Sequence, residues 1–152
     1  MSSLALVLSN KITFSEFLKR PNPNDTLYIL GALFESWIGD DNVYELSQFV
    51  IDQLNSLSKQ GIHIGIMHGN RDFLIGQDFC DAASIELIND PCIIEINGEK
   101  AMLTHGDQLC TDDHEYQAFR SVVRNPIWQK DFLNFQISLW TNLAKEFTRS
   151  QQ

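Results

Sequence analysis

The chain has 152 residues, of which 43% are hydrophobic, and a formal net charge of −9 at pH 7. This length and composition indicate a globular chain with a core of its own and give no sign of disorder. The acidic surplus and the lack of a lysine and arginine cluster exclude bulk binding of nucleic acid, which needs a cationic surface that displaces counterions.

Strands and helices alternate in the first part of the chain. A turn-forming cluster at residues 21–25 precedes a buried apolar strand at 26–30. Apolar residues at helical spacing predict a helix over 43–60, and an apolar strand at 62–67 and a second helix at 73–83 follow it.

A hairpin and further helices complete the pattern. Residues 92–96 and 100–104 flank an Asn-Gly dipeptide, which favours a tight turn between antiparallel strands. The chain turns helical from residue 112, and an Asn-Pro dipeptide at 125–126 ends that helix. Strand, helix, strand, helix and hairpin together predict an α/β fold with a mixed sheet.

The last expected helix, over 127–147, is unusually rich in large apolar side chains. Its main stripe consists of Trp128, Phe132, Phe135, Leu139, Leu143 and Phe147. The stripe is widened by Ile127, Leu133, Ile137 and Trp140. Because this surface exceeds what one core face needs, we expect a helix that the isolated chain cannot fully bury, and self-association of the chain.

The cysteines and the apolar N-terminal run indicate a protein of a reducing compartment. Cys80, Cys92 and Cys110 are an odd number without metal-binding spacing, so a disulfide framework or a thiolate zinc site is not expected. Their apolar neighbours predict buried, unreactive thiols. The run at residues 4–8 is too short for a signal peptide or a membrane span, and no other segment is long enough to span a bilayer.

Two short polar loops, at 68–72 and 105–107, directly follow expected strands. In α/β sheets ligands gather beyond the carboxyl ends of strands, so both loops should meet at one sheet edge. Asn70 and His105 would bring an amide oxygen and an imidazole nitrogen, which suit divalent Mn, Zn or Fe. Each alone would more simply be a turn Asn or a hydrogen-bonded His, but the pair favours one shared metal ion.

The other polar residues of these loops have simpler or undecided roles. Arg71 would either bind a phosphate with its planar guanidinium or form a surface ion pair with Asp72. Asp72 and Asp107 are expected to fix the loops or to orient a ligating histidine rather than to bind metal. His63 and His114 show no spacing signal and are expected to be structural or surface residues.

Acidic pairs stand beside two of the expected helices. The pair at 40–41 is most simply a turn and the start of the helix that follows. Thr111 or Asp112 can cap the later helix, whereas Asp112 and Asp113 could also contact a polar substrate group. On that later helix, Tyr116, Phe119 and Val123 should face the core.

Three segments, 28–41, 68–74 and 105–120, carry motifs of high specificity. Gly-Asn-x-Asp and His-Gly-Asp are typical of the calcineurin-like metallophosphoesterases. The extensions Trp-Ile-Gly-Asp-Asp and Leu-Cys-Thr-Asp-Asp closely resemble one group of that superfamily. This group is the UDP-2,3-diacylglucosamine diphosphatases (hydrolases) of Gram-negative bacteria, enzymes of lipid A synthesis. The resemblance runs from about residue 25 to residue 147.

The resemblance implies a partial α/β/β/α sandwich, with residues 1–125 as core and 126–152 as the beginning of a helical cap. It also implies two Mn²⁺ ions, bridged by an aspartate, that activate a hydroxide for attack on the α-phosphorus of UDP-2,3-diacylglucosamine. The products would be UMP and 2,3-diacylglucosamine 1-phosphate (lipid X). The cap would receive acyl chains, and the protein would be cytoplasmic and peripheral to the inner membrane.

Carried over by position, Asn70 and His105 resemble ligands of the second metal, and Asn70, Arg71 and Asp113 resemble substrate contacts. The position of the bridging aspartate is occupied by Ala32. The family's Asp-x-His pair after the first strand and its terminal Gly-His-x-His have no counterpart here, and residues 13–19 match the family's first helix. We therefore expect a chain truncated at both ends that lacks most metal ligands.

Two hypotheses follow. The chain is either a diphosphatase, completed by a second chain or fragment, or a non-catalytic remnant that binds lipid or protein. Losing one transition-state interaction commonly costs about 10²–10³-fold in rate, so the loss of a bridging ligand and a whole metal site predicts inactivity of this chain alone. A different phosphoesterase activity is disfavoured by the group-specific motifs.

Overall fold

The computed structural model of the chain describes residues 3–4 and 11–149, with side chains described for 14–136 and 138. The residues form two compact units, 1–109 and 110–152. The elements of the first unit are β1 (Ser3–Leu4), α1 (Lys11–Phe17), β2 (Thr26–Leu30), α2 (Glu45–Lys59), β3 (His63–Met67), α3 (Gln77–Ala83), β4 (Glu86–Leu87), β5 (Cys92–Ile96), β6 (Glu99–Leu103) and the 3₁₀ turn η1 (Asp107–Leu109). The second unit contains α4 (His114–Val123) and α5 (Pro126–Arg149).

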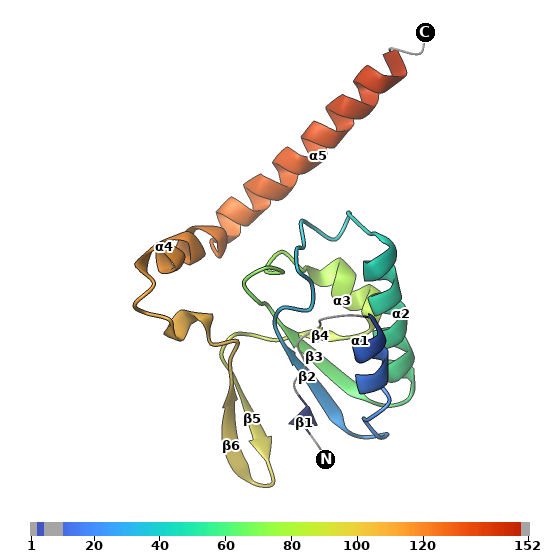
Figure 1. Ribbon diagram of the computed structural model, residues 1–152, viewed down its shortest axis with the longest axis vertical. Helices are drawn as coiled ribbons and strands as arrows, with labels where there is room; N and C mark the ends of the chain where they lie inside the picture. Colours follow the sequence, from blue (N-terminus) through green and yellow to red (C-terminus); the bar gives the residue numbers. More distant parts are fainter. Residues whose placement is uncertain (1–2, 5–10, 150–152) are drawn as a thin grey trace. The chain divides into compact units, whose positions relative to one another are not determined.

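Strands β1 to β4 form a parallel sheet in that order, and β2 and β3 run side by side with Leu30 opposite Met67 (Figure 1). Strands β5 and β6 pair antiparallel as a separate two-stranded sheet. The expected α/β class is therefore confirmed. The parallel and the antiparallel strands form two separate sheets rather than one mixed sheet. Because parallel strands end at one edge, the loops after β2 and β3 emerge next to each other.

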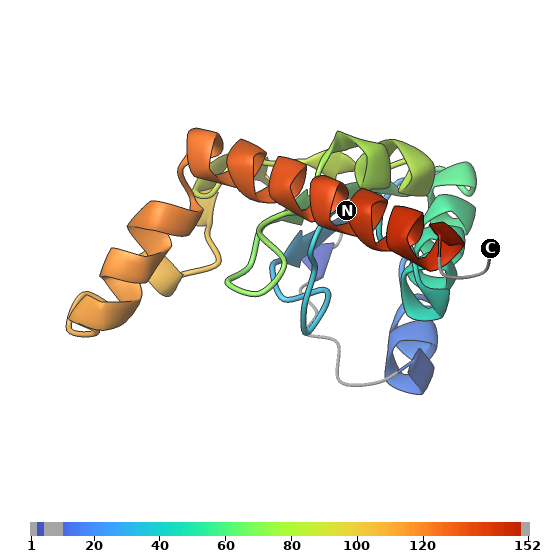
Figure 2. The same ribbon diagram turned by 90° about the horizontal axis from the view of Figure 1, so that it is seen from above.

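The core of the first unit lies between the parallel sheet and the helices that pack on it. Helix α2 packs against β3 and α3. The view from above shows α2, in teal, beside α3, in yellow-green (Figure 2). Alternate residues of β2 point into this core, and Leu27 and Ile29 are each 1% exposed. On α2, Val50 and Leu54 are buried at helical spacing. The helix ends where expected, because Gly61 has the left-handed φ of +86°.

Helix α3 begins at Gln77, four residues later than the apolar pattern suggested. The Asp40 carboxylate accepts hydrogen bonds from the backbone N–H groups of Gly76 (3.0 Å) and Phe79 (2.9 Å), which fixes the first turn there. Asp40 also accepts from Nε1 of Trp37 at 3.0 Å. Residues 40–41 do form the expected turn ahead of α2, which begins at Glu45, and Asp40 in addition caps a helix distant in sequence.

The second unit consists of two helices separated at the expected Asn-Pro break. Asp113, rather than Thr111 or Asp112, caps α4, and its Oδ1 accepts from the Tyr116 N–H at 3.0 Å. Asn125 caps α5 by accepting from the N–H of Ile127 at 2.8 Å, with Pro126 as the first helical residue. The division into core and cap at residue 125 stays a prediction.

The apolar side chains of the second unit are partly exposed. Val123 is buried as expected, but Phe119 is 54% exposed, so its predicted place in a core was wrong. On α5, Trp128 and Phe132 stack with ring centroids 5.0 Å apart, and Ile127 and Phe135 are 71% and 65% exposed. Leu133 is half-buried. The side chains of the other expected stripe residues lie outside the described part of the chain: Ile137, Leu139, Trp140, Leu143 and Phe147. Among the described residues, no helix is long and apolar enough to span a membrane.

The three thiols differ in environment, contrary to the expectation that all are buried. Cys80 on α3 is buried, Cys92 is half-buried and Cys110 is exposed. Burial, together with the nearby carboxylates of Asp40 and Asp81, raises the pKa of the Cys80 thiol to about 11.

Iodoacetamide at about pH 8 should therefore distinguish the thiols, because only the thiolate reacts and a thiol of pKa about 11 is about one part in a thousand ionised there. We expect Cys110 to be alkylated rapidly and Cys80 only after unfolding in guanidinium, as followed by peptide mass spectrometry. Cys110→Ser should remove the fastest phase. Rapid labelling of Cys80 in the native chain would contradict this assignment.

Candidate functional site

The loops after β2, β3 and β6 meet at Gly31, the first residue after β2. Gly31 has φ +86°, and a Cβ on it would stand 2.6 Å from both Gly69 Cα and His105 Nδ1. Only glycine fits such a position, because it needs both the left-handed backbone and the absence of a side chain. The structure thus brings together the two polar loops that were expected to meet, together with the Ala32 loop.

Asp72 fixes this meeting of loops. Its side chain is fully buried, and its Oδ2 accepts hydrogen bonds from the N–H groups of Leu33 (2.6 Å) and Phe34 (3.3 Å). Its Oδ1 accepts from the N–H of Gly69 at 2.7 Å. One carboxylate therefore satisfies three backbone donors from two loops, which is the loop-fixing role expected of Asp72.

One ring nitrogen of His105 is held by the protein backbone. Its Nδ1 lies 2.9 Å from the carbonyl oxygen of Leu30, at the end of β2. A carbonyl oxygen only accepts hydrogen bonds, so Nδ1 carries a proton, and in the neutral imidazole Nε2 then keeps its lone pair. This is the tautomer of a histidine that ligates a metal through Nε2, with its other nitrogen held by a backbone carbonyl.

Asn70 and Arg71 lie on the exposed side of the β3 loop. Arg71 forms an ion pair with Glu35, whose side chain is 81% exposed. The alternative pairing of Arg71 with Asp72 was wrong, because Asp72 is buried against backbone donors. Exposed pairs of this kind contribute little stability, so the guanidinium can exchange Glu35 for another anion at small cost.

The donor set at this edge does not fit a pair of metal ions. Ala32 has the unusual φ of +53° and offers only a methyl group. Within the described part of the chain, no group of three or more His, Cys, Asp or Glu side chains could hold a metal. Asn70 and His105 would bring two neutral donors and no charge, which suits one weakly bound cation at most.

The remaining site residues are placed as follows. Asp113 belongs to the second unit, where it caps α4, and its contact with substrate stays a prediction. Asp107 is 8% exposed and begins the η1 turn. His63 is exposed beside Glu86, with 3.2 Å between Nε2 and Oε2, and His114 is also exposed, as expected.

Two further residues of this edge were missed from the sequence. Asp90 and Thr104 bind each other and the backbone beside His105. Only the Asp-Pro dipeptide before β5 and the threonine before the His-Gly-Asp motif mark these positions, and both are weak signals.

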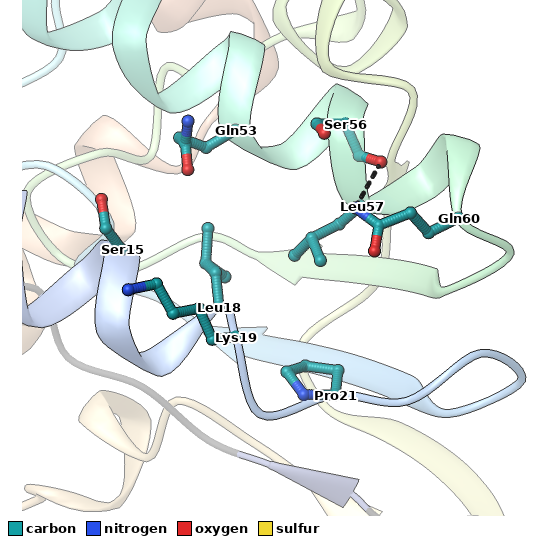
Figure 3. A pocket seen from close by; sticks show the side chains of 8 residues that line it. All are labelled: Ser15, Leu18, Lys19, Pro21, Gln53, Ser56, Leu57 and Gln60. Carbon is teal, nitrogen blue, oxygen red and sulfur yellow. Dashed lines mark hydrogen bonds between the residues drawn. The ribbon is translucent and has the colours of Figure 1, made fainter.

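The pocket of Figure 3 lies elsewhere, between α1 and α2, and contains none of the expected site residues. It has a volume of about 230 Å³ and is lined by Ser15, Leu18, Lys19, Pro21, Gln53, Ser56, Leu57 and Gln60. Its one cationic group, Lys19, already pairs with Glu16.

No family model matches the chain, but curated proteins resemble it over most of its length. It is 46% identical over 133 residues to a UDP-2,3-diacylglucosamine hydrolase of Chromohalobacter salexigens, an alignment that covers 87% of this chain and 54% of that protein. Proteins of the same name from Stenotrophomonas maltophilia and Yersinia pestis are 41% and 43% identical over 140 residues, which cover 91% of this chain and 56% and 58% of theirs. The chain spans about half the length of these relatives.

Replacement of Asp72 by alanine should destabilise the fold by at least about 3 kcal/mol, because three buried backbone donors would lose their acceptor. Urea unfolding at neutral pH measures this change. The matched control is Asp41→Ala, which removes an exposed carboxylate and should shift stability by less than about 0.5 kcal/mol. Equal effects of the two substitutions would show that Asp72 does not hold the loops.

Proposed function

Because the chain belongs to the UDP-2,3-diacylglucosamine hydrolase family, we propose that it carries the frame of an enzyme that cleaves the pyrophosphate of UDP-2,3-diacylglucosamine. The products would be UMP and lipid X. The observation that carries the proposal is the edge at Gly31, where the motif loops pack around Asp72 and His105 presents Nε2.

In this proposal each exposed residue of the edge has a defined task. His105 and Asn70 would ligate a single cation through Nε2 and the amide oxygen, with Mn²⁺ as the family's metal. The Arg71 guanidinium would bind a phosphate oxygen pair after leaving Glu35. By resemblance to the family, Asp113 would also contact the substrate.

We further propose that this chain alone is catalytically impaired. Two-metal sites clamp the attacking and the leaving oxygens together, and this requires ligands for both ions. Ala32 brings no carboxylate to the edge where both loops end, and Asn70 and His105 are neutral. The described residues could therefore support weak binding of substrate or cation better than hydrolysis.

Restoring the bridging carboxylate tests this proposal. Purified chain should release UMP from UDP-2,3-diacylglucosamine at background rate with excess Mn²⁺. Ala32→Asp should raise Mn²⁺ affinity at least about tenfold in isothermal titration, because it adds a charged ligand. The left-handed φ of +53° suits aspartate and asparagine equally, so Ala32→Asn is a matched control that should not improve binding.

Metal-dependent UMP release by the unmodified chain at the rate of a complete family member would refute the impairment. If Ala32→Asp and Ala32→Asn behave alike, position 32 does not face the cation.

A second candidate function, binding of lipid without catalysis, is favoured by the exposed apolar side chains of α5. Ile127 and Phe135 expose most of their surface to water, and burying a large apolar side chain is worth about 1.5–3 kcal/mol. We propose that this surface contacts acyl chains at the cytoplasmic face of the inner membrane, or a second copy of the chain when lipid is absent.

Vesicle sedimentation tests this surface. The chain should bind neutral phosphatidylcholine vesicles, which do not repel its net charge of −9, and should self-associate in plain buffer. Ile127→Ser combined with Phe135→Ser should reduce both, whereas Asn134→Ser, on an exposed polar position of α5, should change neither. A chain that stays monomeric and does not bind the vesicles would refute this proposal.

A further inference from the structure

Asp90, just before β5, reaches the turn that carries His105. Its Oδ1 accepts a hydrogen bond from the Thr104 hydroxyl at 2.7 Å and another from the backbone N–H of His105 at 3.3 Å. The Thr104 Oγ1 in turn accepts from the N–H of Gly106 at 3.1 Å. One carboxylate and one hydroxyl therefore hold three consecutive residues in a single conformation.

These hydrogen bonds also restrict the orientation of the His105 ring. The backbone of His105 is held by Asp90, while its Nδ1 is held by the Leu30 carbonyl at 2.9 Å. Two anchors on different atoms leave the side chain little freedom to turn. If the backbone anchor were lost, Nδ1 could leave the carbonyl and the ring could exchange its tautomer.

The Asp90 carboxylate also lacks partners for one of its two oxygens. Its Oδ2 is buried without a hydrogen-bond partner, and no cationic side chain pairs with it in the described part of the chain. Asp90 as a whole is half-buried, but buried oxygen atoms without a hydrogen-bond partner are rare in folded proteins and cost free energy. A cation close to this oxygen would offset the cost.

We propose that Asp90, together with Thr104, is a positioning residue that holds His105 with Nδ1 on the Leu30 carbonyl and Nε2 free to bind a divalent cation. The inference deepens the proposed function and rests on it for the use of the cation. The orientation of the ring itself can be tested without any activity.

The decisive experiment is ¹⁵N NMR of the His105 ring in the metal-free chain at alkaline pH, where imidazoles are neutral. The native chain and Thr104→Ser should show mainly the Nδ1–H tautomer, because serine keeps the hydroxyl. Thr104→Val and Asp90→Ala should show a mixture of the two tautomers. Either variant suffices if the other does not fold, and His63 is an internal reference whose signals should not move.

A second measurement separates the charge of Asp90 from its hydrogen bonds. Asp90→Asn keeps an accepting oxygen for Thr104 and removes the charge, so the tautomer should be kept. In the Ala32→Asp background, Mn²⁺ affinity should fall about tenfold, as is typical when a group that supports a metal ligand is lost. Glu95→Gln, which removes an exposed charge on β5, is the matched control and should leave affinity unchanged.

A retained Nδ1–H tautomer in both Thr104→Val and Asp90→Ala would overturn the positioning role. Equal Mn²⁺ affinity of Asp90→Asn and Glu95→Gln would overturn the contribution of charge. Metal-dependent UMP release by the unmodified chain at the rate of a complete family member would count against the proposed impairment alone, because the tautomer populations are measured without substrate or metal.

Discussion

The buried carboxylate of Asp72 is the interaction on which the candidate site depends. It accepts three backbone hydrogen bonds, two from the loop after β2 and one from the loop after β3. Apart from Asp72 itself, no side chain of either loop takes part in these bonds, so the path of the loops does not depend on the other residues that they display. The close approach of Gly31 and Gly69 completes the constraint, since a Cβ on either would collide with the other loop.

This arrangement separates the frame of the site from its chemistry. The frame consists of backbone donors and buried acceptors, with Asp40 fixing the start of α3 as Asp72 fixes the loops. The chemistry is carried by exposed or half-buried side chains such as Ala32, Asn70 and His105. A chain can therefore retain the fold and the motifs of a hydrolase family while position 32 lacks a charged ligand.

Local pattern was enough to predict several elements from the sequence. Strand β2 and the β5–β6 hairpin were expected to within a residue, because apolar runs and the Asn-Gly turn are local signals. The parallel-strand rule accounts for the loops after β2 and β3, which emerge side by side. The loop at 105–107 was also expected at this edge, but it follows β6 of the separate antiparallel sheet, so its meeting with them depends on the packing at Gly31.

What the sequence could not predict depends on partners distant along the chain. The start of α3 is set by Asp40, 36 residues before Gly76, and Arg71 pairs with Glu35, 36 residues before it, rather than with its neighbour Asp72. The tautomer of His105 is set by Leu30, 75 residues away. Periodic sequence patterns carry no information about such contacts. Even sequence neighbours can differ, since Arg71 is exposed to solvent and Asp72 is fully buried.

The most direct test of this account is a crystal structure of the unmodified chain grown with Mn²⁺, in which anomalous scattering locates the metal. The account predicts that Asp72 keeps its three backbone donors and that at most one Mn²⁺ is present, bound to Nε2 of His105. Two Mn²⁺ ions about 3.5–4 Å apart at this edge, the spacing of catalytic two-metal sites, would contradict it.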